Sequence, residues 1–210
     1  LMRVVAVDGA PCEPFDIDEV ALAPAQRVDI LLESSATLQS VWEISTGERV
    51  MAASFEHRNA LSSGLPPLLR AVPWYEKPDP AGARQVDIHM QGGAMGNLMS
   101  AEFDGTTRTL QDIARNEKKL WAFNGKIGSY ALDIADVKLG DVVQLNVWND
   151  TRWRHAMHLH GQHFWVSSQE FEGGARDLLR DTYLMQPGER AEFLFVADNP
   201  GDWLFHCHML

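Results

Sequence analysis

The chain has 210 residues, 45% of them hydrophobic, and a formal net charge of −11 at pH 7. This length allows one large β-domain or two domains of roughly 100 residues each, and no apolar run approaches the roughly 20 residues of a membrane-spanning helix. The acidic balance, with scattered basic residues, disfavours a nucleic-acid partner and an anionic membrane surface and favours small neutral or cationic substrates.

The first block, residues 1–75, contains strand-like stretches at 27–34 and 40–45. Turn formers such as "APAQ" stand beside them. The chain begins inside a hydrophobic strand, without an initiating Met or a signal-like segment. We therefore expect its N-terminus to be a cut within a longer protein. The other cysteine, Cys207, is far away in the sequence, and such a pair does not indicate a disulfide framework. Cys12 is therefore most simply a lone structural or surface thiol.

Residues 76–115 are rich in Pro, Gly and Met and predict an ordered but irregular connector. The stretch 108–120 alone has helical spacing. Three methionines, Met90, Met95 and Met99, carry soft sulfurs that suit Cu(I), and simple packing within a loop is the alternative interpretation.

The last block, residues 116–210, again alternates apolar and polar residues, at 141–150 and 190–199. Val143, Leu145 and Val147 follow the period of two that places one strand face in a core. The whole chain therefore predicts an all-β fold with Greek-key or sandwich topology and not βαβ units.

Six of the eight histidines fall in two motifs, "HAMHLHGQH" and "HCH". Because side chains alternate across a strand, His158 and His160 project from one face. His155 is an odd number of residues from His158 and faces the other way. The same rule separates Cys207 from the two histidines that flank it, His206 and His208.

The spacing thus predicts two metal sites that share one strand. One site combines Cys207 with His155, and the other gathers four imidazoles. A thiolate with imidazoles suits copper, and clustered imidazoles without carboxylates also suit copper, although ligand type alone leaves zinc open. A zinc hydrolase would need a carboxylate base near the imidazoles, which neither motif supplies.

At these residues a family resemblance appears. "HAMHLHGQHF" and "DWLFHCH" resemble the two C-terminal copper-binding motifs of the multicopper oxidases, which include laccases and bacterial copper-tolerance oxidases. "LWAFNGK" and "RDTYLMQPGERAEF" are similar to the last cupredoxin domain of that family, and "VDGAPCEP" with "LAPAQRVDILLE" to its second domain. The resemblance implies a cupredoxin-like Greek-key β-sandwich in both blocks.

The same resemblance implies a role for each of six residues. His155 and Cys207 match ligands of the type 1 copper, and His158 matches a ligand of the type 2 copper. His160, His206 and His208 match ligands of the type 3 pair. The remaining histidines, His57, His89 and His163, match no ligand and are expected to be ordinary polar residues.

The implied activity is one-electron oxidation of a reducing substrate, a phenolic compound or a metal ion such as Cu(I), coupled to four-electron reduction of dioxygen to water. Arg152, Trp153 and Arg154 either line the rim of the type 1 site or simply pack and face solvent. A non-catalytic cupredoxin-like electron-transfer module is the alternative function. It would leave four of the histidines superfluous.

The family takes further ligands from an earlier domain and from residues just after "HCH". We therefore expect residues 1–210 by themselves to hold only part of each site and not to act as an oxidase. The resemblance suggests a periplasmic or secreted location.

Overall fold

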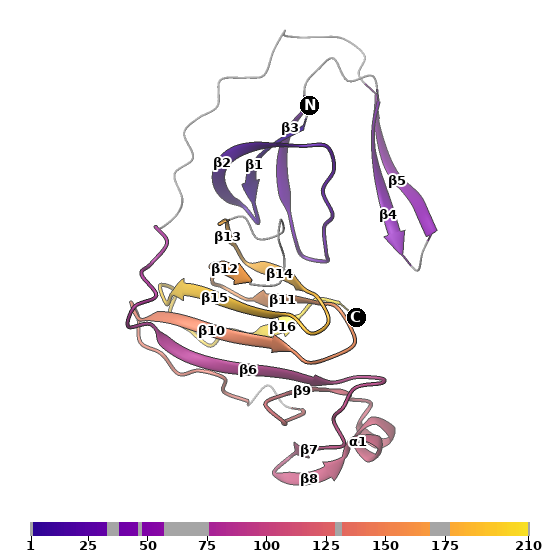
Figure 1. The fold of residues 1–210 in the computed structure, drawn as a ribbon, viewed down its shortest axis with the longest axis vertical. Helices are drawn as coiled ribbons and strands as arrows, with labels where there is room; N and C mark the ends of the chain where they lie inside the picture. Colours follow the sequence, from indigo (N-terminus) through magenta and orange to yellow (C-terminus); the bar gives the residue numbers. More distant parts are fainter. Residues whose placement is uncertain are drawn as a thin grey trace.

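A computed structural model describes residues 2–32, 38–45, 48–56, 76–128, 132–168 and 177–209. Within these ranges the fold is almost entirely β, with one short helix (Figure 1). The all-β prediction is confirmed. No helix among these residues is long and apolar enough to cross a membrane.

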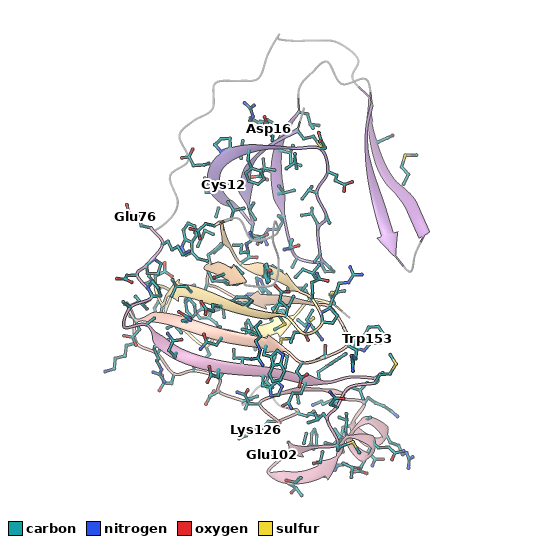
Figure 2. The ribbon with its side chains drawn as sticks, in the orientation of Figure 1. Cys12, Asp16, Glu76, Glu102, Lys126 and Trp153 are labelled. Carbon is teal, nitrogen blue, oxygen red and sulfur yellow. The ribbon has the colours of Figure 1, made fainter. Side chains whose placement is uncertain are left out.

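The N-terminal residues form a small antiparallel sheet with the order β2-β1-β3. Its strands are β1 (Met2–Val7), β2 (Ala10–Ile17) and β3 (Val28–Leu32). A separate antiparallel pair, β4 (Leu38–Ser45) with β5 (Glu48–Glu56), follows in the chain. Cys12 is buried in β2 (Figure 2), so it is a structural thiol and not a surface one.

Two further sheets make a β-sandwich. The larger has the order β13-β12-β15-β10-β6-β9, and the smaller has the order β14-β11-β16. The larger contains β6 (Arg84–Gly92), β9 (Trp121–Phe123), β10 (Val142–Asn149), β12 (Phe164–Ser168), β13 (Leu179–Arg180) and β15 (Arg190–Val196). The smaller contains β11 (His155–Leu159), β14 (Thr182–Met185) and β16 (Phe205–Cys207).

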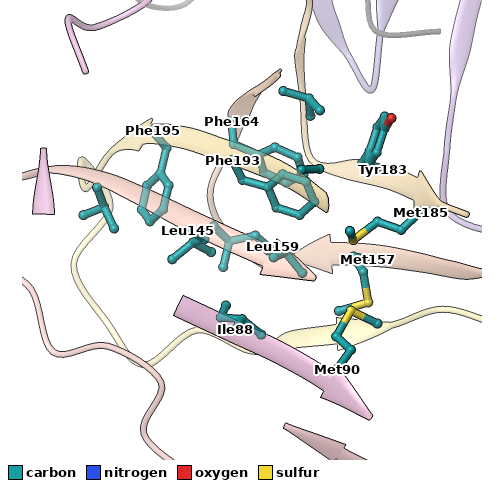
Figure 3. Packing of buried hydrophobic residues seen from close by; sticks show 14 of the residues in the cluster. Ile88, Met90, Leu145, Met157, Leu159, Phe164, Tyr183, Met185, Phe193 and Phe195 are labelled. Atoms are coloured by element: carbon teal, nitrogen blue, oxygen red, sulfur yellow. The ribbon is translucent and has the colours of Figure 1, made fainter. Parts of the chain in front are cut away.

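The main core lies between these two sheets (Figure 3). Val143, Leu145 and Val147 point inward from β10, as their spacing predicted, while Met157 and Leu159 reach the same core from β11. Phe193 of β15 stacks on Phe164 with ring centroids 4.4 Å apart. Burial of large apolar side chains from both sheets is the main force that holds the sandwich closed.

A hairpin of β7 (Ser100–Phe103) and β8 (Thr106–Thr109) leads into α1 (Leu110–Glu117). The helix lies within the predicted stretch 108–120. It begins where the Thr109 side chain accepts a hydrogen bond from the Asp112 N–H, and it ends at Lys118, whose φ is 59°. Ile113 anchors it in a small second core.

The expected irregular connector is wrong for residues 84–92. This segment is β6, which pairs in parallel with β10 along its length and antiparallel with β9. Ile88 and Met90 enter the core from it. The alternation of Val86, Ile88 and Met90 predicts a strand, and the Gly and Met content of the following residues obscured it.

Removal of the Phe193 ring should destabilise the sandwich strongly. Phe193 is fully buried and packs on Phe164 and Tyr183. Phe193→Ala should lower the free energy of unfolding by about 3–5 kcal/mol, because it leaves a cavity between the sheets. Denaturant unfolding measures this, and Leu139→Ala, at a side chain that is 70% exposed, serves as the control. A loss for Phe193→Ala no larger than the control's would contradict this account of the core.

Candidate metal centre

Strand β11 lies between β14 and β16 and pairs antiparallel with each of them. The register pairs Met157 with Cys207 and His158 with His206. Residues directly opposite each other in such a ladder project from the same face of the sheet. The register therefore places Cys207 on one face and His206 on the other.

The inward face carries His155 and Cys207. His155, Met157 and Leu159 alternate on β11 and are buried, and Cys207 packs against the main core beside Met157. The predicted placement of His155 and Cys207 on a common face is confirmed. An imidazole and a thiol thus lie at the boundary of an apolar interior.

Hydrogen bonding orients the His155 ring. Its Nε2 lies 3.1 Å from the Thr151 hydroxyl, and Thr151 also donates to the Asn149 side-chain oxygen at 2.7 Å. Since that bond uses the Thr151 hydrogen, Nε2–H is the donor to Thr151, and Nδ1 keeps its lone pair. Burial lowers the pKa of His155, which favours the neutral ring that a metal ion requires.

Burial acts in the opposite direction on Cys207 and raises the pKa of its thiol. The Met209 N–H donates to the Cys207 Sγ at 3.3 Å and partly offsets this effect. A neutral thiol is poorly reactive, and a bound cation would favour the thiolate instead. The burial of Cys207 therefore suits a metal ligand better than a free nucleophile.

Four imidazoles gather on the outward face. One nitrogen of each of His158, His160 and His206 lies within 4.8 Å of the others. The His208 ring centroid is 5.1 Å from that of His158 and 4.7 Å from that of His206. The predicted four-imidazole grouping is thus present, and burial lowers the pKa of His206.

A tight turn after β11 holds His160 in this group. The His160 N–H donates to the Leu204 carbonyl at 2.9 Å, and its ring stacks on Trp203. Gly161 has φ of 75°, and a Cβ there would lie 2.5 Å from the Trp203 ring. Only glycine fits that position, so Gly161 and Trp203 together fix where His160 stands.

The sequence spacing did not predict the hydrogen-bond partners of the His158 ring. Its Nδ1 lies 3.0 Å from the Asp181 carbonyl and 3.0 Å from the Thr182 hydroxyl. The Asp181 carboxylate in turn binds both terminal nitrogens of Arg27, at 3.1 and 2.7 Å. Arg27 immediately precedes β3, so a residue of the first sheet reaches the surroundings of His158.

The charge on Asp181 is well stabilised. Burial by itself raises the pKa of Asp181, but hydrogen bonds from His158, Arg27 and Thr182, with the charge of Arg27, outweigh burial and hold the pKa far below its ordinary value. Asp181 is therefore a carboxylate, and not a carboxylic acid, at neutral pH. This carboxylate lies behind the imidazole ring and not among the four clustered rings.

The remaining histidines lie elsewhere. His89 stacks on Trp148 and pairs with Asp150 at 3.0 Å, and His163 lies 3.1 Å from the Asp8 carbonyl. His57 falls outside the described residues. Met90 is 3% exposed and belongs to the core, whereas Met95 and Met99 are largely exposed, so the three sulfurs do not share one surface.

One tryptophan contacts His155, and a second lies two residues before it in the chain. The Trp121 ring meets the His155 ring edge-on at 4.7 Å between centroids. Trp153 lies at the periphery of the sandwich (Figure 2) and donates to the Ala94 carbonyl at 3.1 Å. Both tryptophan side chains are about half exposed, and Arg152 and Arg154 are exposed as well. No pattern in the sequence indicates that Trp121 is a neighbour of this site.

The donor set suits copper. A soft thiol with an imidazole on one face, and four imidazoles on the other, are ligands that copper prefers. His155 and His158 each use one ring nitrogen in a hydrogen bond to the protein and keep the other available, as metal-binding histidines do. The residues therefore fit two copper sites on opposite faces of one sheet.

Comparison with known proteins agrees with this chemistry. The family model described as multicopper oxidase matches residues 102–210, and a second model with the same description matches residues 1–62. The multicopper oxidase MmcO of Mycobacterium tuberculosis is 28% identical over 99% of this chain and 39% of its own length. The iron multicopper oxidase fer1 of Mycosarcoma maydis is 32% identical over 99% of this chain and 40% of its own length.

Among solved structures, Lac15 from a marine microbial metagenome superposes with a TM-score of 0.64 and 26% identity. That match covers 100% of this chain and 46% of Lac15. The chain thus spans about two fifths of the length of the curated relatives that it matches. With one family match over more than half of its residues, this chain belongs to the multicopper oxidase family, whose members bind copper.

Proposed function

We propose that this protein works as a multicopper oxidase that takes electrons from a small reducing substrate on the His155 and Cys207 side and delivers them to dioxygen on the histidine side. The register between β11 and β16 carries this proposal. It places Cys207 on one face and His206 on the other, although the two residues are covalent neighbours.

In this proposal each of the six residues keeps the role that the family pattern gives it. His155 and Cys207 are ligands of the type 1 copper, and His158 is a ligand of the type 2 copper. His160, His206 and His208 are ligands of the type 3 pair. Copper, when bound, supplies one-electron oxidation at the first site and reduction of dioxygen at the second.

The protein supplies the connection and the environment. Cys207 is bonded through the backbone to His206 and His208, so the covalent path between the two faces is one residue long. Thr151 orients His155, while Trp203 and Gly161 position His160. The apolar core around Cys207 limits water at that side of the sheet.

The reducing substrate in our proposal is a small aromatic compound. The half-exposed Trp121 ring touches the His155 ring and offers an aromatic surface beside the electron entrance. A metal ion is the alternative substrate, and exposed Met95 and Met99 are its best-placed soft donors. By family resemblance we place the protein in the periplasm or outside the cell.

A non-catalytic electron-transfer module is the competing function. Such a module would need only the His155 and Cys207 side. The gathering of His158, His160 and His206 within 4.8 Å on the opposite face, with His208 beside them, favours the oxidase.

The role of Cys207 can be tested with Co²⁺, which probes a thiolate without oxidising it. In residues 1–210 loaded with Co²⁺, Cys207→Ser should abolish the thiolate-to-metal absorption, because serine offers no sulfur. The histidine cluster should still bind Co²⁺. Cys12→Ser removes the other buried thiol and should leave the spectrum unchanged.

Retention of the thiolate band in Cys207→Ser, or its loss in Cys12→Ser, would contradict the assignment. Dioxygen consumption by the same chain loaded with copper would show that ligands outside residues 1–210 are unnecessary, against our expectation.

The substrate class can be tested by paired variants of an active, copper-loaded protein. Trp121→Leu should raise KM for a phenol roughly 2- to 10-fold, because aromatic stacking is lost. Met95→Leu with Met99→Leu should leave phenol oxidation unchanged. The aromatic assignment is wrong if Trp121→Leu leaves KM for the phenol unaltered, and a loss of Cu(I) oxidation alone in the methionine variant favours the metal ion.

A further inference from the structure

Oxygen atoms of Asp181 and Thr182 lie close to the His158 Nδ1 and act as hydrogen-bond acceptors. The Asp181 carbonyl lies 3.0 Å away and the Asp181 Oδ1 3.5 Å away. The Thr182 hydroxyl, also at 3.0 Å, donates its hydrogen to Asp181 Oδ1 at 2.7 Å and is left as an acceptor. Nδ1 must therefore carry the hydrogen, and Nε2 keeps its lone pair.

These acceptors are held by the first sheet. Asp8, in the turn after β1, accepts hydrogen bonds from the backbone N–H groups of Asp181 and Thr182 at 3.1 and 3.2 Å. Its carboxylate is fully buried. Asp8 thus fixes the backbone that presents the carbonyl and the hydroxyl to His158.

Arg27 fixes the side chain of the same segment. Its two terminal nitrogens bind the two carboxylate oxygens of Asp181, and one of them also donates to the Asp8 carbonyl at 2.7 Å. A bidentate pair sets the orientation of a carboxylate more strictly than a single bond does. The carboxylate plane of Asp181 is therefore set by a residue 154 positions earlier in the chain.

We propose that Asp8 and Arg27 are positioning residues that hold His158 in the tautomer with Nε2 free toward the histidine cluster. They act through Asp181 and Thr182 and touch none of the four clustered rings. The proposal rests on the proposed function only in taking His158 as a metal ligand. Correct assembly of the first sheet on the sandwich thereby becomes a condition for a competent cluster.

The test uses Arg27→Met in the full 210-residue chain, with Arg3→Met as the matched control. Arg3 also forms a bidentate pair, with Asp16 inside the first sheet, through its Nε and one terminal nitrogen at 2.6 and 3.0 Å. Both variants lose one arginine and one bidentate pair with an aspartate. Only the Arg27 pair is connected to His158, through Asp181.

Two readouts separate positioning from general stability. In the metal-free chain, imidazole nitrogen NMR shifts should show one His158 tautomer in wild type and Arg3→Met and a mixture in Arg27→Met. Affinity of the cluster for Cu²⁺, measured by titration of chains that also carry Cys207→Ser, should fall roughly 10- to 100-fold in Arg27→Met only. Asp8→Asn should give the same pattern, because both oxygens of Asp8 accept backbone hydrogens, one from Asp181 and Thr182 and the other from Arg27, and an amide would place an NH2 donor against one of these N–H groups.

An unchanged tautomer and an unchanged Cu²⁺ affinity in Arg27→Met would overturn the proposal, even if the melting temperature fell. If Arg27→Met shifts the tautomer but the wild-type chain binds no Cu²⁺, the positioning role is supported and the assignment of His158 as a metal ligand is overturned. If Arg27→Met does not fold, Arg27→Lys decides by the same two readouts, because lysine keeps the charge but loses the bidentate geometry.

Discussion

The antiparallel hydrogen bonding of β11 with its two neighbours is the constraint on which the rest of the molecule depends. Side chains alternate strictly between the two faces of a paired strand, so the register with β11 fixes the face on which each residue of β16 projects. A slip of one residue would turn Cys207 outward and His206 into the core. The Phe205 side chain, which packs against the main core from the same strand as Cys207, opposes such a slip, since it would turn outward too.

The same constraint explains how much of the site the sequence could predict. Alternation places His155 with Cys207 and His158 with His206, and this holds in the structure. It works because these residues lie in or directly beside strands that pair with each other. Chemistry set by parity within a strand can be predicted from spacing, and the all-β fold follows from the same regularity.

Other features depend on contacts between distant segments, and these carry no local signal. Asp181 and Arg27 look like ordinary surface charges in the sequence, and only the docking of the first sheet on the sandwich brings them together. Trp121 meets His155 because β9 joins the larger sheet at its edge. The strand at residues 84–92 is hard to predict for another reason, since the Gly and Met content of the residues that follow outweighs its alternation.

The place of β16 has a consequence for the metal-free protein. This strand is three residues long, lies at the edge of its sheet, and carries Cys207 between two clustered histidines. So short a strand gains little from its own ladder, and metal ions would bind it to β11 through side chains from both strands. Metal ions held by histidines of both strands would therefore fasten β16 to β11 and keep that edge of β11 covered, where an open strand edge could pair with another chain.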